Sequence, residues 1–202
     1  MNISNSPSPA RRRSRVRADI LAAAAAEISE AGVEKASLRA IARRVGISHQ
    51  ALSYHFTDRR AVLTALAVDG FRQLVALSAD AVEQVESDAP LGHRAAAIGI
   101  AYVRFAERNR PLFTLMLGSA QIDPTDEELV AARLAMWILL LATATTENDN
   151  GWGGSADPET MAILAWMIVH GMATIGDLIP TDVDPGDLVL ILNRAIAIRE
   201  DR

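Results

Sequence analysis

The sequence predicts an all-α protein with a small three-helix head at its N-terminus and a six-helix body after it. Apolar residues recur at helical spacing along most of the 202 residues, and no stretch alternates apolar and polar positions as a half-buried strand does. Residues 1–60 contain eleven Arg or Lys and five acidic residues, a net charge of +6, whereas the remainder contains nine basic and twenty acidic residues, a net charge of −11. A basic head on an acidic body is typical of a protein that docks on nucleic acid through one end.

The composition narrows the class of protein further. The chain is 50% hydrophobic, which is typical of a folded protein, and it has no cysteine, which excludes disulfides and thiolate metal sites and fits a reducing compartment. The first residues lack the apolar stretch of a secretory signal. The longest candidate apolar run, residues 134–144, is about half of a membrane span. We therefore expect a cytoplasmic protein without membrane contact.

The N-terminus is expected to begin with a disordered basic arm over residues 1–15. Residues 1–10 are rich in Ser, Pro and Asn, and an arginine-rich cluster follows at 11–15. This cluster is either a solvated tail or an arm that neutralises phosphates or enters a minor groove. A first helix is predicted from about residue 17 to residue 31, because its apolar residues share one face and Gly32 follows it.

Two short helices with a tight turn between them are predicted next. Residues 38–45 place apolar side chains at i, i+3, i+4 and i+7, and Ser37 occupies the N-cap position before them. Gly46 can adopt the positive φ that ends such a helix, and Ser48 can cap a second one. Two short helices joined by a Gly-containing turn form a helix-turn-helix.

The second of these helices presents a polar face that suits a DNA major groove. Its inward side is predicted to carry apolar residues, namely Ala51, Leu52 and Phe56. Gln50, Ser53 and Tyr54 then point outward. Gln can pair bidentately with adenine, Ser can bond a base or a phosphate, and a Tyr hydroxyl can reach a phosphate. The alternative is an ordinary solvated face.

The following helix begins with a pair of arginines. Asp58 is its predicted N-cap, so Arg59 and Arg60 lie in the first turn, where the helix dipole disfavours each cation by about 0.3 to 1 kcal/mol. Such a pair requires an anionic partner. We expect a DNA phosphate to be that partner, held by both guanidinium groups.

These stretches share a pattern with a known family. The shared residues are Ser37-Leu38-Arg39-x-Ile41-Ala42, Gly46-Ile47-Ser48, Ala51-Leu52-x-x-His55-Phe56 and the basic Arg59. The pattern resembles the DNA-binding domain of the TetR family of bacterial transcriptional regulators, which would occupy residues 16–60. Gln50 and Ser53 depart from the family's usual residues, a small residue and Tyr. The resemblance and the face together suggest that DNA is contacted by Ser37, Arg39, Ser48, His49, Gln50, Ala51, Ser53, Tyr54, His55, Arg59 and Arg60.

The remainder of the chain, residues 61–202, reads as six helices. The first is an amphipathic rod about 40 Å long at 1.5 Å per residue, continuous from the head. The predicted ranges are 60–85, 90–109, 111–118, from about 125 to 145, 158–178 and 185–199, with a loop at 147–156. Thr125, Asp157 and Asp184 are the predicted N-caps of the last three. The TetR resemblance implies the same number and order of helices, with an effector-binding and dimerising body.

One motif in the body supports the resemblance. Trp166-x-x-x-His170-Gly171 resembles the C-terminal domain of a TetR subgroup with a Trp-His-Gly signature. The alternative is plain core, with Trp stacked beside a hydrogen-bonded His and a Gly that allows close helix packing. The last two helices are apolar almost all round, so they must be buried on more than one side. We therefore expect a homodimer in which these helices form a four-helix interface.

The body is expected to bind a hydrophobic effector between its helices. Aromatic, Met and polar side chains at helical spacing could line such a cavity, although residues of this kind are often ordinary core. The candidates are Tyr102, Phe113, Met116, Met136, Trp137, Trp166 and His170.

The sequence offers no signal for catalysis. It has no glycine-rich phosphate loop and no nucleophile elbow, and its four histidines lack metal-ligand spacing, so no cofactor or metal is expected. We expect a ligand-responsive repressor that binds a palindromic operator on double-stranded DNA as a homodimer. Two alternatives remain open: a ligand-binding all-α dimer without DNA binding, and a helical enzyme acting on a hydrophobic small molecule.

Overall fold

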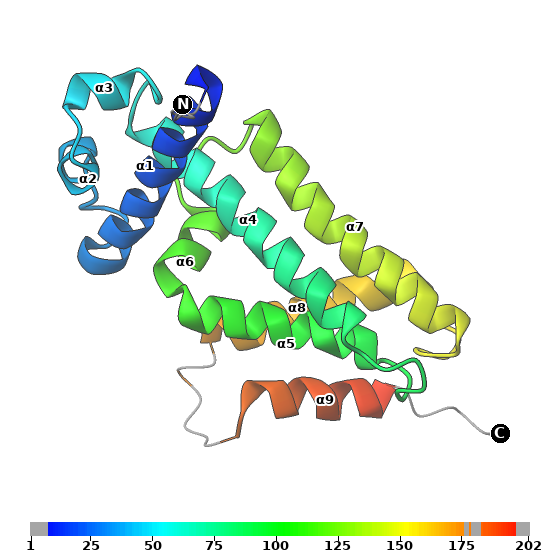
Figure 1. Ribbon diagram of the computed structural model, residues 1–202. Helices are drawn as coiled ribbons and strands as arrows, with labels where there is room; N and C mark the ends of the chain where they lie inside the picture. Colours follow the sequence, from blue (N-terminus) through cyan, green and yellow to red (C-terminus); the bar gives the residue numbers. More distant parts are fainter. Residues whose placement is uncertain (1–7, 176–177, 179–182, 197–202) are drawn as a thin grey trace, which may run out of the picture. The chain divides into compact units, whose positions relative to one another are not determined.

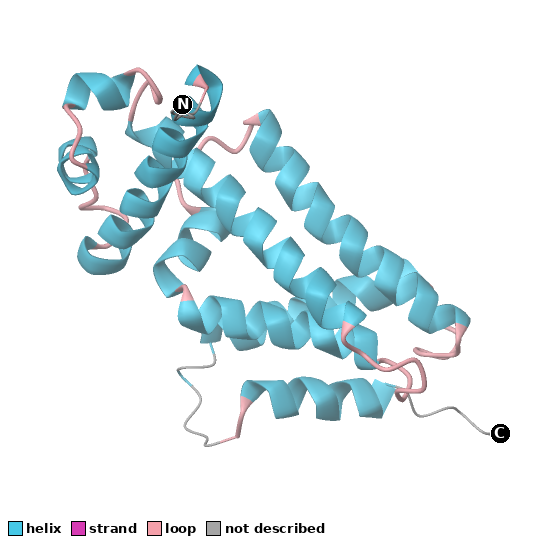
Figure 2. Cartoon of the chain, in the orientation of Figure 1, coloured by secondary structure: helices cyan, strands magenta, loops and turns pink. Residues whose placement is uncertain are grey.

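The computed structural model describes residues 8–175, 178 and 183–196, and this part of the chain is helical without strands (Figures 1 and 2). The all-α prediction is therefore confirmed for these residues. The nine helices that they form are α1 (Pro9–Ala31), α2 (Leu38–Val45), α3 (His49–Ser53), α4 (Arg59–Glu83), α5 (His93–Arg108), α6 (Arg110–Gly118), α7 (Glu127–Asp149), α8 (Pro158–Ile175) and α9 (Pro185–Ile196).

The chain divides into two compact units. The first comprises residues up to Asp69 together with Pro111–Leu129, and the second comprises Gly70–Arg110 and the residues from Val130 onward. Helix α4 starts in the first unit and ends in the second. The predicted boundary, after residue 60, thus differs from this division in two ways: it falls earlier on the chain, and it leaves segment 111–129 in the body.

The predicted caps of the helix-turn-helix are confirmed. Ser37 Oγ accepts a hydrogen bond from Ala40 N at 3.2 Å, and Ser48 Oγ accepts one from Ala51 N at 3.1 Å. Gly46 adopts a left-handed conformation with φ 78°, which ends α2 and turns the chain toward α3. Each cap satisfies a backbone group that the short helices cannot pair internally.

Helix α1 starts earlier than predicted. Ser8 caps it, accepting from Arg11 N at 3.4 Å, and Pro9 occupies the first turn. Residues 11–15 are therefore helical, and the predicted disordered arm is wrong for them, while residues 1–7 lie outside the described part. Ser followed by Pro is a helix-start signal. The sequence analysis missed that signal because the Ser, Pro and Asn content of residues 1–10 indicated disorder.

The later helices follow their predicted starts with one correction. Asp157 accepts from Thr160 N at 2.9 Å and Asp184 from Gly186 N at 2.8 Å, as expected of caps. Helix α7, however, is capped by Asp126, which accepts from Leu129 N at 2.9 Å. Thr125 instead donates its hydroxyl proton to an aspartate two residues earlier. The predicted ends of the last two helices, near 178 and 199, involve residues outside the described part.

The core of the second unit is built on α5, which packs against both α8 and α9. Gly99 makes this packing close, because a Cβ at that position would lie 3.0 Å from Val169 and from Val189. Trp152 is fully buried beside the start of α5. The buried carboxylate of Glu147 accepts the α5 N-terminal amide of Gly92 at 2.5 Å.

Three helices are long and apolar enough to cross a membrane by length and composition, namely α4, α7 and α8. The expectation that no segment reaches this length is therefore wrong. It considered a short apolar run, whereas these helices are apolar over a longer stretch that includes isolated polar residues. The share of the apolar 18-residue stretch that is buried is 56% in α4, 33% in α7 and 22% in α8. Much of the apolar surface of α7 and α8 thus lies open in a single chain.

An ion pair between α1 and α2 gives the first unit a testable acid dependence. Arg44 donates to Glu30 at 2.9 and 2.6 Å and to Glu27 at 3.1 Å. These hydrogen bonds and the positive charge hold the pKa of Glu30 below its ordinary value of 4.5. A carboxylate with a lowered pKa stabilises the fold above its ordinary pKa, and this stabilisation is lost as the pH falls through the folded-state value.

We expect Glu30→Gln to lower the thermal unfolding midpoint at neutral pH, and we expect the difference from wild type to shrink as the pH falls below 4.5. Circular dichroism melts across this range measure it. Asp19→Asn, which removes an exposed carboxylate from the same helix, is the matched control. A difference that is equal at neutral and acid pH would contradict the assignment.

Candidate functional site

Helix α3 is anchored through its apolar residues. Leu52 is fully buried and Phe56 nearly so, as the sequence predicted. Ala51 was expected on the same inward side, but it is exposed. The helix has only five residues, His49–Ser53, and its end is turned by Tyr54. Ala51 therefore lies on the edge of the outer face instead of in the core.

The polar residues of α3 point outward as predicted. Gln50 and Ser53 are exposed, and Tyr54 is 71% exposed although it is aromatic. Ser53 donates its hydroxyl proton to the carbonyl of His49 at 3.0 Å, which leaves the oxygen as an acceptor. Tyr54 meets the ring of His55 edge-on, with 5.6 Å between centroids. The face combines an amide, hydroxyls and an open aromatic ring on a fixed base.

The other residues predicted around this face have mixed roles. Ser37 and Ser48 use their hydroxyl oxygens as helix caps, so their first role is structural. Arg39 on α2 is exposed. His49 is exposed at the start of α3. These positions surround Gln50 on the chain.

The two arginines that open α4 are already bonded within the first unit. Arg59 Nε donates to Ala36 O at 2.6 Å, and its two other nitrogens donate to the Val33 carbonyl and to the Gln121 side chain. Arg60 donates to the carbonyl of Ile122 at 2.9 Å.

The pair therefore finds its acceptors within the protein, in backbone carbonyls, and a contact of either arginine with a DNA phosphate stays a prediction. The helix dipole argument was sound in demanding a partner for Arg59 and Arg60. The sequence does not show that residues 33–36 and 121–122 meet the start of α4. Gln121 extends the network, since its amide donates to both carboxylate oxygens of Glu34 at 3.0 and 2.9 Å.

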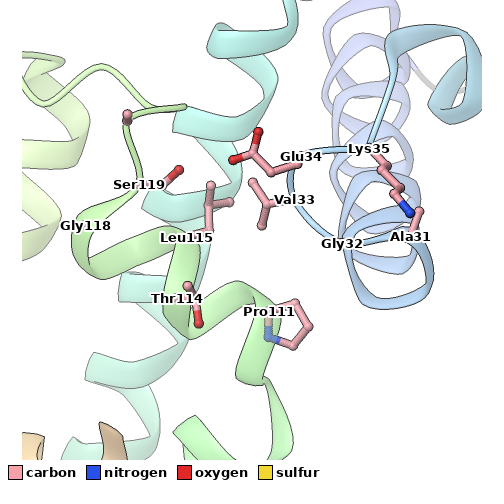
Figure 3. Close-up of a pocket in the computed structure, with 11 residues that line it drawn as sticks. Ala31, Gly32, Val33, Glu34, Lys35, Pro111, Thr114, Leu115, Gly118 and Ser119 are labelled. Atoms are coloured by element: carbon pink, nitrogen blue, oxygen red, sulfur yellow. The ribbon is translucent and has the colours of Figure 1, made fainter.

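A groove that the sequence did not predict lies beside this network in the first unit. Its volume is about 660 Å³, and it is bordered by the α1–α2 turn on one side and by α6 on the other (Figure 3). Val33 and Leu115 lie near its centre, with Glu34 and Ser119 toward one end and Pro111 toward the other. No sequence signal could have found it, because its two sides are about 80 residues apart.

The predicted effector residues do not form one cavity. Phe113 and Met116 are buried in the first unit, whereas Tyr102, Met136 and Trp166 belong to the second. The latter three line a cavity of about 20 Å³, room for about one water molecule. Tyr102, Met136, Phe113 and Met116 are buried in the cores of their units, which is the alternative that the sequence left open, whereas Trp166 is exposed.

The Trp-His-Gly motif shows how this packing is arranged. Tyr102 Oη lies 3.0 Å from His170 Nδ1, and the rings of Trp137 and Trp166 lie 6.0 Å apart. Burial raises the pKa of Tyr102 to about 12, so the phenol stays protonated at neutral pH. Gly171 was expected to permit close helix packing, yet a Cβ there would meet nothing within 4 Å in a single chain.

Comparisons with known proteins agree with these features. The sequence model described as "Bacterial regulatory proteins, tetR family" matches residues 20–66, and the model "Tetracyclin repressor-like, C-terminal domain" matches residues 95–187. The two matched ranges cover the helix-turn-helix and the Trp-His-Gly motif. A comparison with curated proteins found no match.

Several solved structures share the fold across the whole chain. A protein of unknown function from Rhodococcus sp. RHA1 is 33% identical, with a TM-score of 0.79, over 98% of this chain and 100% of that one. The TetR family transcriptional regulator PfmR from Thermus thermophilus is 22% identical, with a TM-score of 0.67, over 91% of this chain and 96% of that one. The fatty acid degradation regulator FadR from Bacillus halodurans is 13% identical, with a TM-score of 0.68, over 95% of this chain and 96% of that one.

The helix-turn-helix is capped and has an outward polar face, family models match both parts of the chain, and solved structures share its fold. The chain therefore belongs to the TetR family of bacterial regulatory proteins and is a DNA-binding transcriptional regulator.

Proposed function

We propose that the protein is a ligand-responsive repressor that binds a palindromic operator as a homodimer in the cytoplasm and catalyses no reaction. The observation that carries the DNA-binding part is the outer face of α3. Leu52 is fully buried beneath it, while Gln50, Ser53 and Tyr54 are exposed above. A short helix held in this way presents three different polar groups in a fixed orientation, which is what base readout in a major groove requires.

The geometry favours a narrower contact set than the sequence suggested. Gln50 is the proposed base reader, and the exposed methyl of Ala51 suits the methyl group of thymine. Arg39 and Tyr54 are the proposed phosphate contacts on either side. Arg59 and its neighbour are left out, because their guanidinium groups are bonded to protein carbonyls.

The exposed apolar surface of the second unit supports the homodimer. On α7, Val130, Leu134 and Ile138 follow one another at four-residue spacing and are each about half exposed. On α8 the exposed apolar residues are Ile163, Leu164, Trp166, Met167 and Ile175. Exposed apolar residues concentrated on two helices are typical of an interface. We propose that a second copy of the chain covers this surface. The proposed interface then consists mainly of α7 and α8, whereas the sequence predicted α8 and α9.

The effector is proposed to enter the second unit near Tyr102 and Trp166. The cavity there holds about one water molecule, so a larger hydrophobic ligand requires these side chains to separate. A ligand that binds only the separated arrangement would shift the population toward it, by no more than its differential affinity for the two states.

Replacing Gln50 by Ala should weaken binding to a specific duplex by about 5- to 150-fold, the range of one bidentate base contact, and should change binding to random duplex little. The specific probe is a duplex that the wild-type protein selects from a random-sequence library, and fluorescence anisotropy measures both affinities. Gln84→Ala, an exposed glutamine beyond the end of α4, is the control. Equal losses on specific and random DNA would contradict base readout by Gln50.

Charged residues placed in the exposed apolar surface should prevent dimerisation. We expect Leu134→Glu and Met167→Glu to be monomeric at micromolar concentration in sedimentation equilibrium, where the wild type is dimeric, because two buried carboxylates per interface would lack partners. Leu77→Glu, an equally exposed leucine on α4, should remain dimeric. The assignment fails if the wild type is a monomer or if the α7 and α8 variants still dimerise.

A further inference from the structure

The N-terminal turns of α1 carry an unusual concentration of positive charge. Five arginines lie between residues 11 and 17, and the first turn has no acidic residue to match the helix dipole. These side chains are mostly exposed, and their positions on α1 are fixed by the Ser8 cap and Pro9. The arginines that the sequence suggested as a disordered arm thus lie on the first turns of a helix.

Two of the arginines contact aromatic rings near the end of α3. The guanidinium carbon of Arg13 lies 5.6 Å from the ring centroid of Tyr54, and that of Arg17 lies 5.0 Å from Phe56. Both distances are within the range of cation–π attraction. The pair joining Arg13 and Tyr54 is exposed, whereas Phe56 is buried, so only the first pair can take part in binding.

A groove of about 460 Å³ lies between the start of α1 and α3. Its walls combine cationic, aromatic and apolar side chains, namely Arg12, Arg13, Val16, Ile47, Ala51, Tyr54 and His55. Arg12 offers a guanidinium fork that suits a phosphate. Val16 and Ile47 offer an apolar floor that suits a deoxyribose.

We propose that this groove binds one phosphodiester of the DNA backbone together with its sugar, and that Arg13 is a positioning residue that holds the Tyr54 ring as one wall of it. The proposal rests on the proposed DNA-binding function and deepens it. Arg12 neutralises the phosphate, and Tyr54, fixed by Arg13, directs its hydroxyl to the same strand. The groove extends the protein surface beyond the five-residue α3, which is too short to contact a long stretch of DNA alone.

The observations favour a DNA strand as the occupant for two reasons. The walls present cations above an apolar floor, which matches the alternation of phosphate and sugar along a strand. The groove also contains Ala51 and Tyr54, the residues at the edge of the α3 face that is proposed to read bases. A strand whose bases meet Gln50 would therefore have its backbone beside this groove.

The first test measures the salt dependence of binding to the duplex selected by the wild-type protein. Arg12→Gln should reduce the slope of log K against log salt by about one, as expected when one phosphate contact is lost. Arg108→Gln removes the same charge from the exposed end of α5 in the second unit, and it should leave the slope unchanged. Equal slopes for the two variants would overturn the phosphate contact.

The second test asks whether Arg13 acts through Tyr54. Arg13→Gln should weaken binding by about two- to fivefold, the size of one exposed cation–π contact, and Arg13→Lys should restore most of it. In a Tyr54→Leu background, Arg13→Gln should have a smaller effect than in the wild type. Additive losses, or no rescue by Lys, would overturn the positioning role.

The outcomes separate this inference from the function on which it rests. If the wild type selects no duplex, the proposed function fails and the inference fails with it. If the wild type binds a specific duplex and Gln50→Ala weakens it, while the Arg12 and Arg13 variants behave like Arg108→Gln, only the inference fails. All the substituted residues are exposed, so matching circular dichroism spectra are expected and would confirm that the variants fold.

Discussion

The burial of Leu52 and Phe56 is the constraint on which the functional surface depends. Helix α3 is too short to be stable by itself, so tertiary packing must hold it. Once these two side chains are buried, the side of α3 that faces water is determined, and it carries Gln50 and Tyr54. The serine cap and the left-handed Gly46 fix where the helix starts. The orientation of the exposed α3 side chains is thus a consequence of packing.

The first unit includes a segment that lies far along the chain, and polar contacts attach it. Arg59 joins the α1–α2 turn to Gln121, and Thr64 Oγ1 accepts a hydrogen bond from Asp123 N at 2.9 Å. These contacts explain why Pro111–Leu129 belongs with the helix-turn-helix. A pair of arginines that an isolated helix would disfavour is stabilised by the carbonyls of neighbouring turns. Arg59 is therefore a residue that holds segments of the first unit together.

Local signals predicted most of the helices, whereas contacts between distant segments could not be predicted. The caps Ser37, Ser48 and Asp58, the last of which accepts from Ala61 N at 2.8 Å, were found because capping depends on residues only three positions away. The Arg59 acceptors lie 23 to 62 residues from it along the chain, and the two sides of the groove beside α6 are about 80 residues apart, so a single sequence does not bring either set together. Ala51 was misplaced because α3 ends after five residues, so an ideal helical wheel does not describe its edge. The effector residues were chosen by residue type, and type does not separate cavity walls from core.

The central claim is that α3 reads DNA, and a hydroxyl-radical footprint of the wild-type protein on the genomic DNA flanking its gene tests it most directly. A dimer that presents two such helices should protect two half-sites of related sequence whose centres lie about 34 to 36 Å apart, or about one helical turn. The protected bases should be contacted in the major groove, and methylation of guanine N7 there should interfere with binding. A protein that protects no site on any fragment, even at low salt, would contradict the account.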